Sequence, residues 1–444
     1  MKGLAEVSMN DFVNDFKLKL KRKQIKIAVV GLGYVGLPLA VEFAKKGFSV
    51  LGLELDKDRL ANVRDKVSYI TDVPAQDLKK IIASKKFSAT DSFHALKNID
   101  VILICVPTPL KTKYSPDISF IKNAVRSISK NIKRKAIVVL ESTTYPGTTE
   151  EVILPIFQAA GLRHGEDFYL CFSPERIDPG NIRFPLHKIP KVIGGISKEA
   201  TLLTSLVYQN IIEKVVPVSS ARVAETVKLL ENTFRLINIG LIDEMAMMAQ
   251  KMKIDIWEVI DAASTKPFGF MPFYPGPGVG GHCIPKDPLY LSWKAKHHGF
   301  VCRFIKLASD VISFMPVYVV NQVEEILNQK NIKLKKANIL VIGVTYKKDI
   351  KDLRKSPALE ILENLEKRKV LTAYYDPLIP FLKINQINLK SINLTPGEIE
   401  KFDCVIIATD HSCIDYDLLL KKSRLIFDAR NVYRGVENKK IIKL

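Results

Sequence analysis

A glycine-rich turn between an apolar run and a helical pattern constrains this chain more than any other feature. Residues 27–40 read IAVVGLGYVGLPLA, with Gly31, Gly33 and Gly36 in the spacing GxGxxG. In a strand–turn–helix unit the first glycine permits the tight turn, the second leaves room for a pyrophosphate, and the third lets the helix pack on the strand. The free N–H groups at the start of such a helix face the phosphates. The motif predicts a dinucleotide-binding unit.

The pattern around this turn repeats along the chain. From about 25 to 193, short apolar runs such as VILICVP and AIVVLEST alternate with amphipathic segments, which is typical of a parallel sheet covered by helices on both faces. Residues 220–264 instead repeat apolar residues at helical spacing and predict one or two long helices. A Pro/Gly-rich segment (267–288) and further helical runs follow, and alternation returns after 330.

We therefore expect an α/β protein with an N-terminal Rossmann domain, a long central helical segment and a C-terminal Rossmann-like domain. The expected boundaries are a basic N-terminal extension (1–24), the first α/β domain (25–217), the central helical domain (218–329) and the second α/β domain (330–444).

The composition bears on whether the protein binds nucleic acid or a membrane. The net charge of +20 comes from lysines spread along the chain, with KLKLKRK (17–23) as the dense run. The basic residues form no stripe interleaved with aromatics, so we expect no nucleic-acid partner. No apolar run approaches the roughly 20 residues of a membrane span, and the first 24 residues lack the apolar core of a secretory signal. We expect a cytoplasmic protein with a solvated N-terminal extension.

The six cysteines form no CxxC pair, and the histidines at 282, 297 and 298 have no second cluster to complete a ligand set. We expect no metal site.

The second apolar run ends in an acidic residue that bears on the cofactor. Glu54 follows Gly36 by eighteen residues, where a carboxylate can accept hydrogen bonds from ribose hydroxyls and repel a 2′-phosphate. This favours NAD. Arg59 lies five residues further on and could attract a 2′-phosphate, so the residues alone leave NADP open.

Two further stretches point to chemistry. Lys228 and Asn232 are four residues apart and share one face of the predicted long helix, where an ammonium and a carboxamide can hold an oxyanion. By itself such a pair is more often a solvated face. Cys283 lies in GVGGHCIPKDP (278–288), among glycines and charged residues, whereas a structural cysteine prefers apolar neighbours.

Seven motifs occur in a fixed order and together span most of the chain. They are GLGYVGLP, CVPTPL, ESTTYPGTT, FSPERIDPG, AETVKLLENTF, GVGGHCIPKDP and GVTYKKDIKDLRKSP. With them, residues 25–435 resemble the nucleotide-sugar 6-dehydrogenases of the UDP-glucose/GDP-mannose dehydrogenase family. The resemblance implies NAD as cofactor, a UDP-sugar as substrate, a C-terminal UDP-binding domain, and a homodimer formed through the central helix.

The resemblance also implies two successive oxidations at C6 of the sugar, from alcohol to aldehyde to acid. The second oxidation needs a nucleophile, because a thiolate converts the aldehyde into a thiohemiacetal that can be oxidised to a thioester. The implied roles are nucleophile (Cys283), oxyanion stabilisation (Lys228 and Asn232, with Lys228 a candidate proton acceptor in the first step), water positioning (Thr143 and Asp287) and general base for hydrolysis (Glu175).

The binding residues implied by the resemblance fall into two sets. The cofactor set is Gly31, Gly33, Tyr34, Val35, Gly36, Glu54, Arg59, Pro107, Thr108 and Thr143. The substrate set is Glu175, Arg176, Lys228, Asn232, Phe273, Tyr274, Gly276, Gly280, Tyr346, Lys347 and Arg430. Tyr346 stands where the family most often has phenylalanine, and Glu54 where it has aspartate.

One segment of the sequence bears on which UDP-sugar is the substrate. The segment STKPFGFMPFYPG (264–276) resembles the branch that acts on UDP-N-acetylglucosamine, and its prolines and aromatics offer a stiff apolar surface to an acetamido methyl. UDP-N-acetylmannosamine and UDP-glucose stay as alternatives, and the aromatics could pack on a dimer partner instead. The product would serve surface polysaccharide biosynthesis. Remote alternatives are a two-electron hydroxyacid dehydrogenase, which has no use for Cys283, and a non-catalytic nucleotide-sugar sensor.

Overall fold

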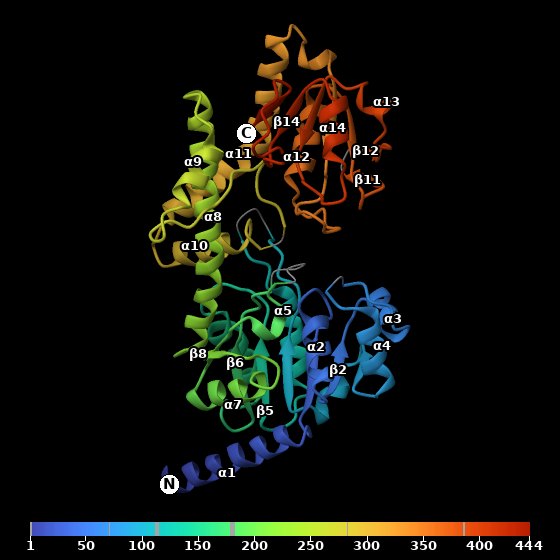
Figure 1. Ribbon diagram of the computed structural model, residues 1–444. Helices are drawn as coiled ribbons and strands as arrows, with labels where there is room; N and C mark the ends of the chain where they lie inside the picture. Colours follow the sequence, from blue (N-terminus) through green and yellow to red (C-terminus); the bar gives the residue numbers. More distant parts are fainter. Residues whose placement is uncertain (1, 71, 112–114, 178–182, 282, 385–386) are drawn as a thin grey trace. The chain divides into compact units, whose positions relative to one another are not determined.

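The computed structural model describes residues 2–70, 72–111, 115–177, 183–281, 283–384 and 387–444, with side chains from residue 11 onward. The chain forms two compact units, residues 1–231 and 232–444, which are described separately below (Figure 1).

The first unit is built on an eight-stranded sheet in the order β3-β2-β1-β4-β5-β6-β7-β8. Its pairs are parallel except for β6 and β7, which run antiparallel. The strands are β1 (Lys26–Val30), β2 (Ser49–Leu53), β3 (Phe87–Thr90), β4 (Val101–Ile104), β5 (Ala136–Leu140), β6 (Phe168–Phe172), β7 (Lys191–Gly195) and β8 (Val215–Pro217). The helices between them are α2 (Gly36–Lys45), α3 (Lys57–Arg64), α4 (Ala75–Ala83), α5 (Ser119–Ser129), α6 (Leu154–Ala159) and α7 (Lys198–Tyr208).

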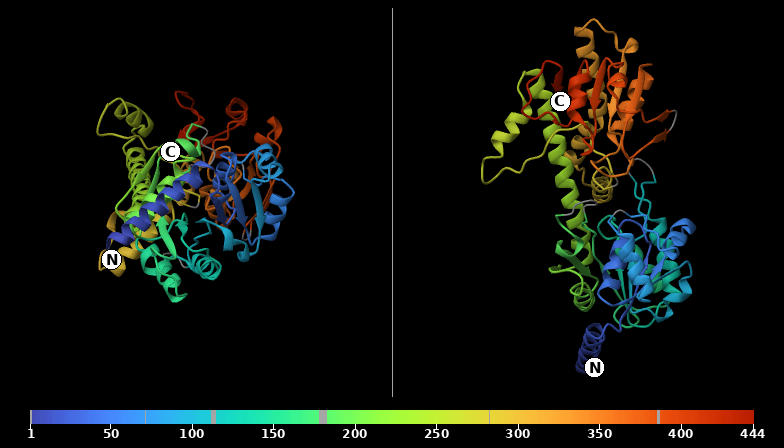
Figure 2. Two further views of the ribbon diagram at one scale, coloured as in Figure 1. Left: turned by 90° about the horizontal axis from the view of Figure 1, so that it is seen from below. Right: turned by 45° about the vertical axis from the view of Figure 1, so that its right-hand side comes forward.

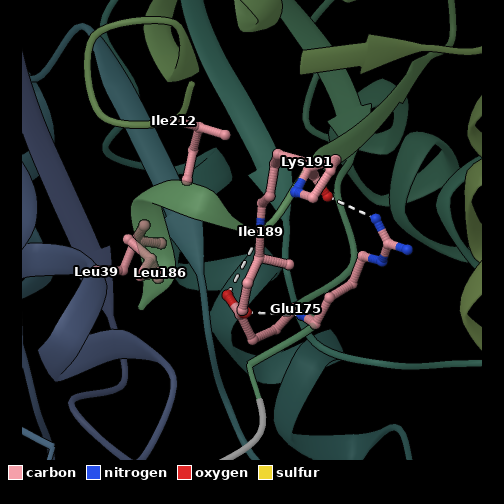
Figure 3. Close-up of a pocket in the computed structure, with 8 residues that line it drawn as sticks. Leu39, Glu175, Leu186, Ile189, Lys191 and Ile212 are labelled. Carbon is pink, nitrogen blue, oxygen red and sulfur yellow. Dashed lines mark hydrogen bonds and ion pairs between the residues drawn. The ribbon is translucent and has the colours of Figure 1, made fainter. Parts of the chain in front are cut away.

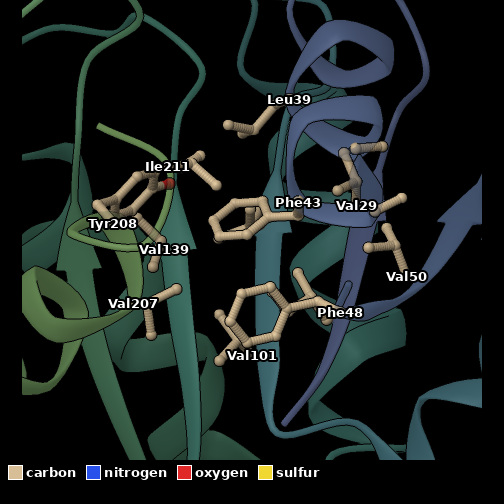
Figure 4. Packing of buried hydrophobic residues seen from close by; sticks show 14 of the residues in the cluster. Val29, Leu39, Phe43, Phe48, Val50, Val101, Val139, Val207, Tyr208 and Ile211 are labelled. Atoms are coloured by element: carbon tan, nitrogen blue, oxygen red, sulfur yellow. The ribbon is translucent and has the colours of Figure 1, made fainter. Parts of the chain in front are cut away.

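Helices cover both faces of this sheet, which is why the central strands are apolar throughout. On one face the ring of Phe43 in α2 packs edge-on against Phe48 at 5.9 Å and, in a tilted arrangement, against Tyr208 of α7 at 6.0 Å (Figure 4). On the other face α5 and α6 pack on the sheet, and Phe157 stacks on Phe168 at 4.4 Å. The predicted doubly covered Rossmann sheet is confirmed.

The N-terminal segment differs from the expected solvated extension. Residues Lys2–Lys21 form helix α1, which leads into the amino-terminal end of β1 (Figures 1 and 2). Val13, Phe16 and Leu20 are buried in the core of the first unit, and the ring of Phe12 stacks on Tyr169 at 5.7 Å. The prediction was wrong for residues 11–21, because an apolar stripe at positions 13, 16 and 20 lies among the lysines.

The central segment is helical, as predicted. It comprises α8 (Ala221–Lys251), α9 (Ile256–Ala263), α10 (Asp287–His297) and α11 (Arg303–Gln329). Helices α8 and α11 pack closely where Gly240 meets Ala308, since a Cβ at Gly240 would lie 2.9 Å from the Ala308 Cα. By length and composition α11 could cross a membrane, but its Met315, Val319, Val320, Val323 and Leu327 lie in the core of the second unit.

The second unit contains a five-stranded, all-parallel sheet in the order β10-β9-β13-β14-β15. Its strands are β9 (Asn338–Ile342), β10 (Leu371–Tyr375), β13 (Cys404–Ile407), β14 (Ile426–Asp428) and β15 (Ile441–Lys443). Helices α12 (Pro357–Lys367), α13 (Pro396–Ile399) and α14 (Tyr416–Lys422) and the hairpin β11 (Phe381–Ile384) and β12 (Ile387–Lys390) complete it. The second α/β domain is therefore present, while the predicted boundaries at 217/218 and 329/330 stay predictions.

Candidate active site

The glycine turn has the geometry that a dinucleotide requires. Gly31 has φ +92°, and a Cβ there would lie 2.7 Å from the carbonyl oxygen of Cys105. A Cβ at Gly36 would lie 1.9 Å from the Gly31 carbonyl oxygen, so α2 can pack here only without a side chain. At Gly33 a Cβ would meet nothing closer than the Arg59 Nη1 at 3.9 Å, which leaves the turn open to a ligand. The residues fit NAD.

Glu54 at the end of β2 shapes this turn directly. Its Oε2 accepts a hydrogen bond from the Leu32 N–H (2.8 Å), and its Oε1 accepts from the N–H groups of Leu55 (2.9 Å) and Asp56 (3.0 Å). Arg59 Nη1 lies 3.9 Å from the Glu54 Oε2. A carboxylate offers about four acceptor sites, so three are occupied and roughly one remains for a ribose hydroxyl.

The other cofactor candidates follow the carboxyl ends of neighbouring strands. Tyr34 and Pro107 are exposed, Thr108 is buried, and Val35 and Thr143 are partly buried. The Ser142 Oγ donates to the carbonyls of Ile104 (3.2 Å) and Val106 (2.7 Å), which ties the loop after β5 to the loop after β4. The fold thus gathers these candidates at the edge of the sheet where dinucleotides bind.

Glu175 and Arg176 follow β6 and face different partners. The Glu175 Oε1 accepts hydrogen bonds from the N–H groups of Arg176 (2.6 Å) and Ile177 (2.7 Å). The Arg176 guanidinium pairs with Glu231 of α8 (Nη2 to Oε1, 2.6 Å) and donates to the Pro190 carbonyl. Residues 178–182 of the same motif lie outside the described part of the chain.

Two charged residues that the sequence did not single out lie beside Glu175. Lys191 is buried, and its Nζ contacts Glu141 Oε2 at 2.6 Å. The same Nζ lies 3.3 Å from Glu175 Oε2 (Figure 3). The sequence could have indicated Glu141, because this carboxylate directly follows the fully apolar strand β5. The sequence does not indicate a role for Lys191. This residue is the first of β7, and it lies at the carboxyl end of β6 only because β7 runs antiparallel to β6.

Glu225 near the start of α8 is a third residue that the sequence reading missed. It is buried and accepts hydrogen bonds from the Gly147 N–H (2.5 Å), the Thr149 N–H (2.9 Å) and the Thr149 Oγ1 (2.7 Å). Burial raises the pKa of Glu225 to about 7, against the lowering effect of these donors. Glu225 therefore anchors α8 to the loop that carries Thr143.

Helix α8 carries the predicted oxyanion pair. Lys228 and Asn232 are both largely buried and lie one helical turn apart on α8, as their spacing predicted. The Asn232 Nδ2 donates a 2.6 Å hydrogen bond to the Oδ2 of Asp287, the first residue of α10. The structure thus joins two candidates that are 55 residues apart in sequence.

Cys283 is exposed and lies just before α10. Its carbonyl oxygen accepts hydrogen bonds from the N–H groups of Lys286 (3.1 Å) and Asp287 (2.8 Å), so the cysteine backbone begins this helix. Burial lowers the pKa of Lys286, against the raising effect of the charges of Asp287 and Cys283. His282 lies outside the described residues.

The glycines before Cys283 make a close contact with a distant segment of the chain. A Cβ at Gly280 would lie 2.5 Å from the Tyr346 Cβ, and one at Gly281 would lie 2.8 Å from the Tyr346 ring. Gly281 also has φ +84°. The segment before Cys283 therefore packs closely against Tyr346, the candidate for stacking on uracil, and Lys347 follows it in the same loop.

The remaining substrate candidates lie on the segment that leads into the cysteine loop. The Gly276 N–H donates to Asp243 Oδ1 (3.0 Å), and a Cβ at Gly276 would lie 2.9 Å from the Arg430 Nη1. The ring of Phe273 packs edge-on against Phe234 of α8 at 5.8 Å, and Tyr274 stacks on Trp257 at 6.0 Å. Both aromatics thus have partners within the chain.

Within the described residues, no group of three or more His, Cys, Asp or Glu side chains could hold a metal ion.

Comparison with known proteins gives three family matches in chain order. The UDP-glucose/GDP-mannose dehydrogenase family models match as the NAD binding domain at residues 25–212, the central domain at 222–340 and the UDP binding domain at 340–435.

Relatives of known name cover nearly the whole chain. A UDP-N-acetyl-D-glucosamine 6-dehydrogenase of Pseudomonas aeruginosa is 37% identical over 395 residues, which cover 88% of this chain and 91% of that protein. A UDP-N-acetyl-D-mannosamine dehydrogenase of Pyrococcus horikoshii is 35% identical over 417 residues, covering 92% and 96%. The solved structure of a UDP-D-ManNAc dehydrogenase from Pyrococcus horikoshii superposes with a TM-score of 0.86 at 33% identity, covering 94% of this chain and 99% of that one.

Proposed function

Because the chain belongs to the UDP-glucose/GDP-mannose dehydrogenase family, whose members are NAD-dependent UDP-sugar 6-dehydrogenases, we propose that it oxidises C6 of a UDP-sugar twice, to the uronic acid. The observation that carries this proposal is the setting of Cys283. The exposed Cys283 lies just before α10, and Asp287, the first residue of that helix, is hydrogen-bonded to Asn232 of α8. A two-electron dehydrogenase needs no such thiol.

In this mechanism, bound NAD supplies the acceptor for one hydride in each of the two oxidations. Lys228 Nζ takes the hydroxyl proton of the C6 alcohol in the first oxidation. The Lys228 ammonium and the Asn232 amide then hold the oxygen on C6 as it gains negative charge. Their burial strengthens this effect, because electrostatic interactions are stronger away from water.

The second oxidation uses the thiol. Cys283 Sγ adds to the C6 aldehyde to give a thiohemiacetal, and loss of a hydride and a proton from this adduct leaves a thioester. Thr143 and Asp287 orient a water molecule, and Glu175 takes a proton from it as its oxygen bonds to the thioester carbon. The C–S bond then breaks, and the product leaves as a carboxylic acid that ionises.

The UDP moiety of the substrate would bind to the second unit. Tyr346 would stack on the uracil, while Lys347 and Arg430 would contact phosphate or sugar oxygens. A UDP-binding domain at residues 340–435 supports this assignment. Phe273, Tyr274, Gly276 and Gly280 would border the sugar.

For the sugar itself we propose UDP-N-acetyl-D-glucosamine, oxidised to UDP-N-acetyl-D-glucosaminuronate. The segment 264–276 exposes apolar side chains, among them Phe268, Phe270 and Met271, which an acetamido methyl could contact and a bare hydroxyl could not. UDP-N-acetyl-D-mannosamine is the second candidate, because relatives with that name are as similar as those named for the glucosamine substrate. UDP-glucose is the third.

The test is to count NADH formed from a panel of UDP-sugars. We expect two NADH per sugar and the highest kcat/KM with UDP-N-acetyl-D-glucosamine. One methyl in an apolar pocket is worth about 1–3 kcal/mol, so the preference over UDP-glucose should be roughly 10- to 200-fold. A higher kcat/KM with another sugar would change the substrate assignment, whereas one NADH per sugar would refute the four-electron mechanism.

We further propose a cytoplasmic homodimer that serves surface polysaccharide biosynthesis. Helix α8 exposes Leu230, Phe234, Leu241 and Met248 along one stripe, and α11, which packs on α8, exposes Phe304 and Leu307. An exposed apolar surface of this extent on two adjacent helices is typical of a subunit interface. The uronate product retains its UDP group and is therefore a donor for glycosyl transfer.

A further inference from the structure

A buried chain of charges lies at the carboxyl edge of the first sheet. Lys191 stands between two carboxylates, with Glu141 at 2.6 Å and Glu175 at 3.3 Å from its Nζ, and it also donates to the Pro174 carbonyl at 3.2 Å. These three acceptors use all three ammonium hydrogens. The Tyr208 hydroxyl donates to the other oxygen of Glu141.

The fold brings these residues together from separate elements. Glu141 follows β5, Glu175 follows β6, Lys191 begins β7 and Tyr208 ends α7. Cys105, which follows β4, adds a partly buried cysteine. The pKa of its thiol is raised well above its usual value, first by burial and then by the charge of Glu141. Since β7 runs antiparallel to β6, its first residue lies at the edge where the parallel strands end.

The chain of charges is buried at Glu141 and accessible at Glu175. The side chain of Glu141 is 0% exposed and that of Lys191 6%, whereas that of Glu175 is 11% exposed and lines a small pocket with Arg176, Ile189 and Lys191 (Figure 3). Glu175 is fixed from both sides, because its Oε1 accepts two backbone N–H groups and its Oε2 faces Lys191. A proton exchanged with this cluster therefore enters at Glu175.

The cation keeps its charge in this setting. Burial alone would lower the pKa of Lys191, but the charges of Glu141 and Glu175 outweigh it, and the pKa is raised. Burial raises the pKa of Glu141, although the charge of Lys191 opposes this. A buried ion pair is often no more stabilising than apolar side chains of the same volume, so stability is a weak reason for its presence.

We propose that Lys191, held by Glu141, is a positioning residue for Glu175 that fixes its carboxylate for proton transfer during thioester hydrolysis. The inference rests on the proposed role of Glu175. In that step a proton passes from water to Glu175, the water oxygen bonds to the thioester carbon, the C–S bond breaks, and the Cys283 sulfur leaves with the electron pair. No oxidation occurs, and the cluster passes from a net charge of −1 to 0.

Three variants of the full-length enzyme and one control test this proposal. Lys191→Met alone would leave Glu141 buried without its cation, so the informative variant is the double substitution Glu141→Gln/Lys191→Met, which removes both charges together. Glu141→Gln alone leaves Lys191 to interact with Glu175 only. Lys191→Arg restores the cation, and Lys214→Met makes the same change as Lys191→Met at an exposed lysine. NAD titration confirms that the first unit is folded in each.

The readouts separate hydrolysis from oxidation. With the double variant we expect a pre-steady-state burst of NADH as in the wild type, followed by a steady-state rate lower by on the order of 10- to 100-fold. Intact-mass spectrometry should then find the sugar acyl group on Cys283. Lys191→Arg should recover most of the rate.

The role of Lys191 would be overturned by either of two results in the double variant. One is a burst and a steady-state rate equal to those of the wild type. The other is an equal loss of both phases without an acyl adduct on Cys283. If the wild type itself formed fewer than two NADH per UDP-sugar, the proposed function would be wrong and this inference would fall with it.

Discussion

Asn232 Nδ2 and Asp287 Oδ2 lie 2.6 Å apart, and this hydrogen bond fixes the start of α10 to the middle of α8. Both side chains are buried, so water cannot replace either partner. Asp287 is four residues beyond Cys283, whose carbonyl accepts the Asp287 N–H. The loop that carries Cys283 is thus linked to Asn232 of α8 through this contact.

This coupling can be measured by a double-mutant cycle. Asn232→Ala should destabilise the protein by about 1–3 kcal/mol, because the buried Asp287 carboxylate loses a donor. With Asp287→Ala and the double variant, the cycle should give an interaction energy of about 1–3 kcal/mol in urea unfolding. Additive effects within about 0.5 kcal/mol would mean that the two residues are not coupled.

Replacing Cys283 separates the two oxidations. Cys283→Ala, or Cys283→Ser, should lower uronate formation by more than about 10³-fold, because neither side chain can form the thioester. NAD binding should be unchanged, since the glycine turn belongs to the first unit. Cys413→Ala, which removes another exposed thiol, serves as the matched control. Product analysis by mass spectrometry decides the matter, and full uronate production by Cys283→Ala would contradict the mechanism.

Asp243 should make the stability of the second unit depend on pH. Burial raises its pKa from 3.8 to about 7, against the hydrogen bond from Gly276 and the charge of Arg430. Because the folded-state pKa is the higher one, the folded protein binds more protons between these values, and the stability present below pH 4 is lost as the pH rises through 7. The loss is on the order of 4 kcal/mol.

The matched variant is Asp243→Asn, which keeps an oxygen for the Gly276 N–H but does not titrate. In denaturant unfolding, its stability relative to the wild type should rise from about pH 4 to pH 7 and then level off. A difference between the two proteins that stays constant over this range would show that Asp243 does not titrate as described.

The parts of the fold that could be predicted from the sequence depend on local pattern. The turn at Gly31, the apolar strands and helix α8 each follow from spacing within one segment. Lys228 and Asn232 needed only a continuous helix to share a face. Predicting these features required no knowledge of contacts with other segments of the chain.

The features that were missed depend on contacts between distant segments. Lys191 meets Glu141 only because β7 runs antiparallel to β6, and the sequence KVIGG does not indicate the direction of the strand. Gly280 and Gly281 pack against Tyr346, which lies 65 or more residues later in the sequence. Asp243 on α8 accepts a hydrogen bond from Gly276, which lies 33 residues later.

Subunit association should respond to a charge in the exposed stripe of α8. Leu241 is 55% exposed in the single chain, and Leu241→Arg would place a charge in the proposed apolar interface. We expect the wild type to scatter light as a dimer at micromolar concentration and the variant as a monomer. Leu371→Arg, at a similarly exposed leucine of β10, should leave the dimer intact. A wild-type monomer would refute the proposed assembly.

Helix α1 should contribute measurably to the stability of the first unit. Phe16 is 4% exposed and lies in the core together with Val13 and Leu20, so Phe16→Ala removes a buried ring and leaves a cavity. Such a change costs about 3–5 kcal/mol in a well-packed core. The control is Leu18→Ala on the exposed side of the same helix, where we expect a change within about 0.5 kcal/mol. Urea unfolding followed by circular dichroism gives both values. If the two variants had equally small effects, α1 would not be part of the folded core, and the expectation of a solvated extension would be restored.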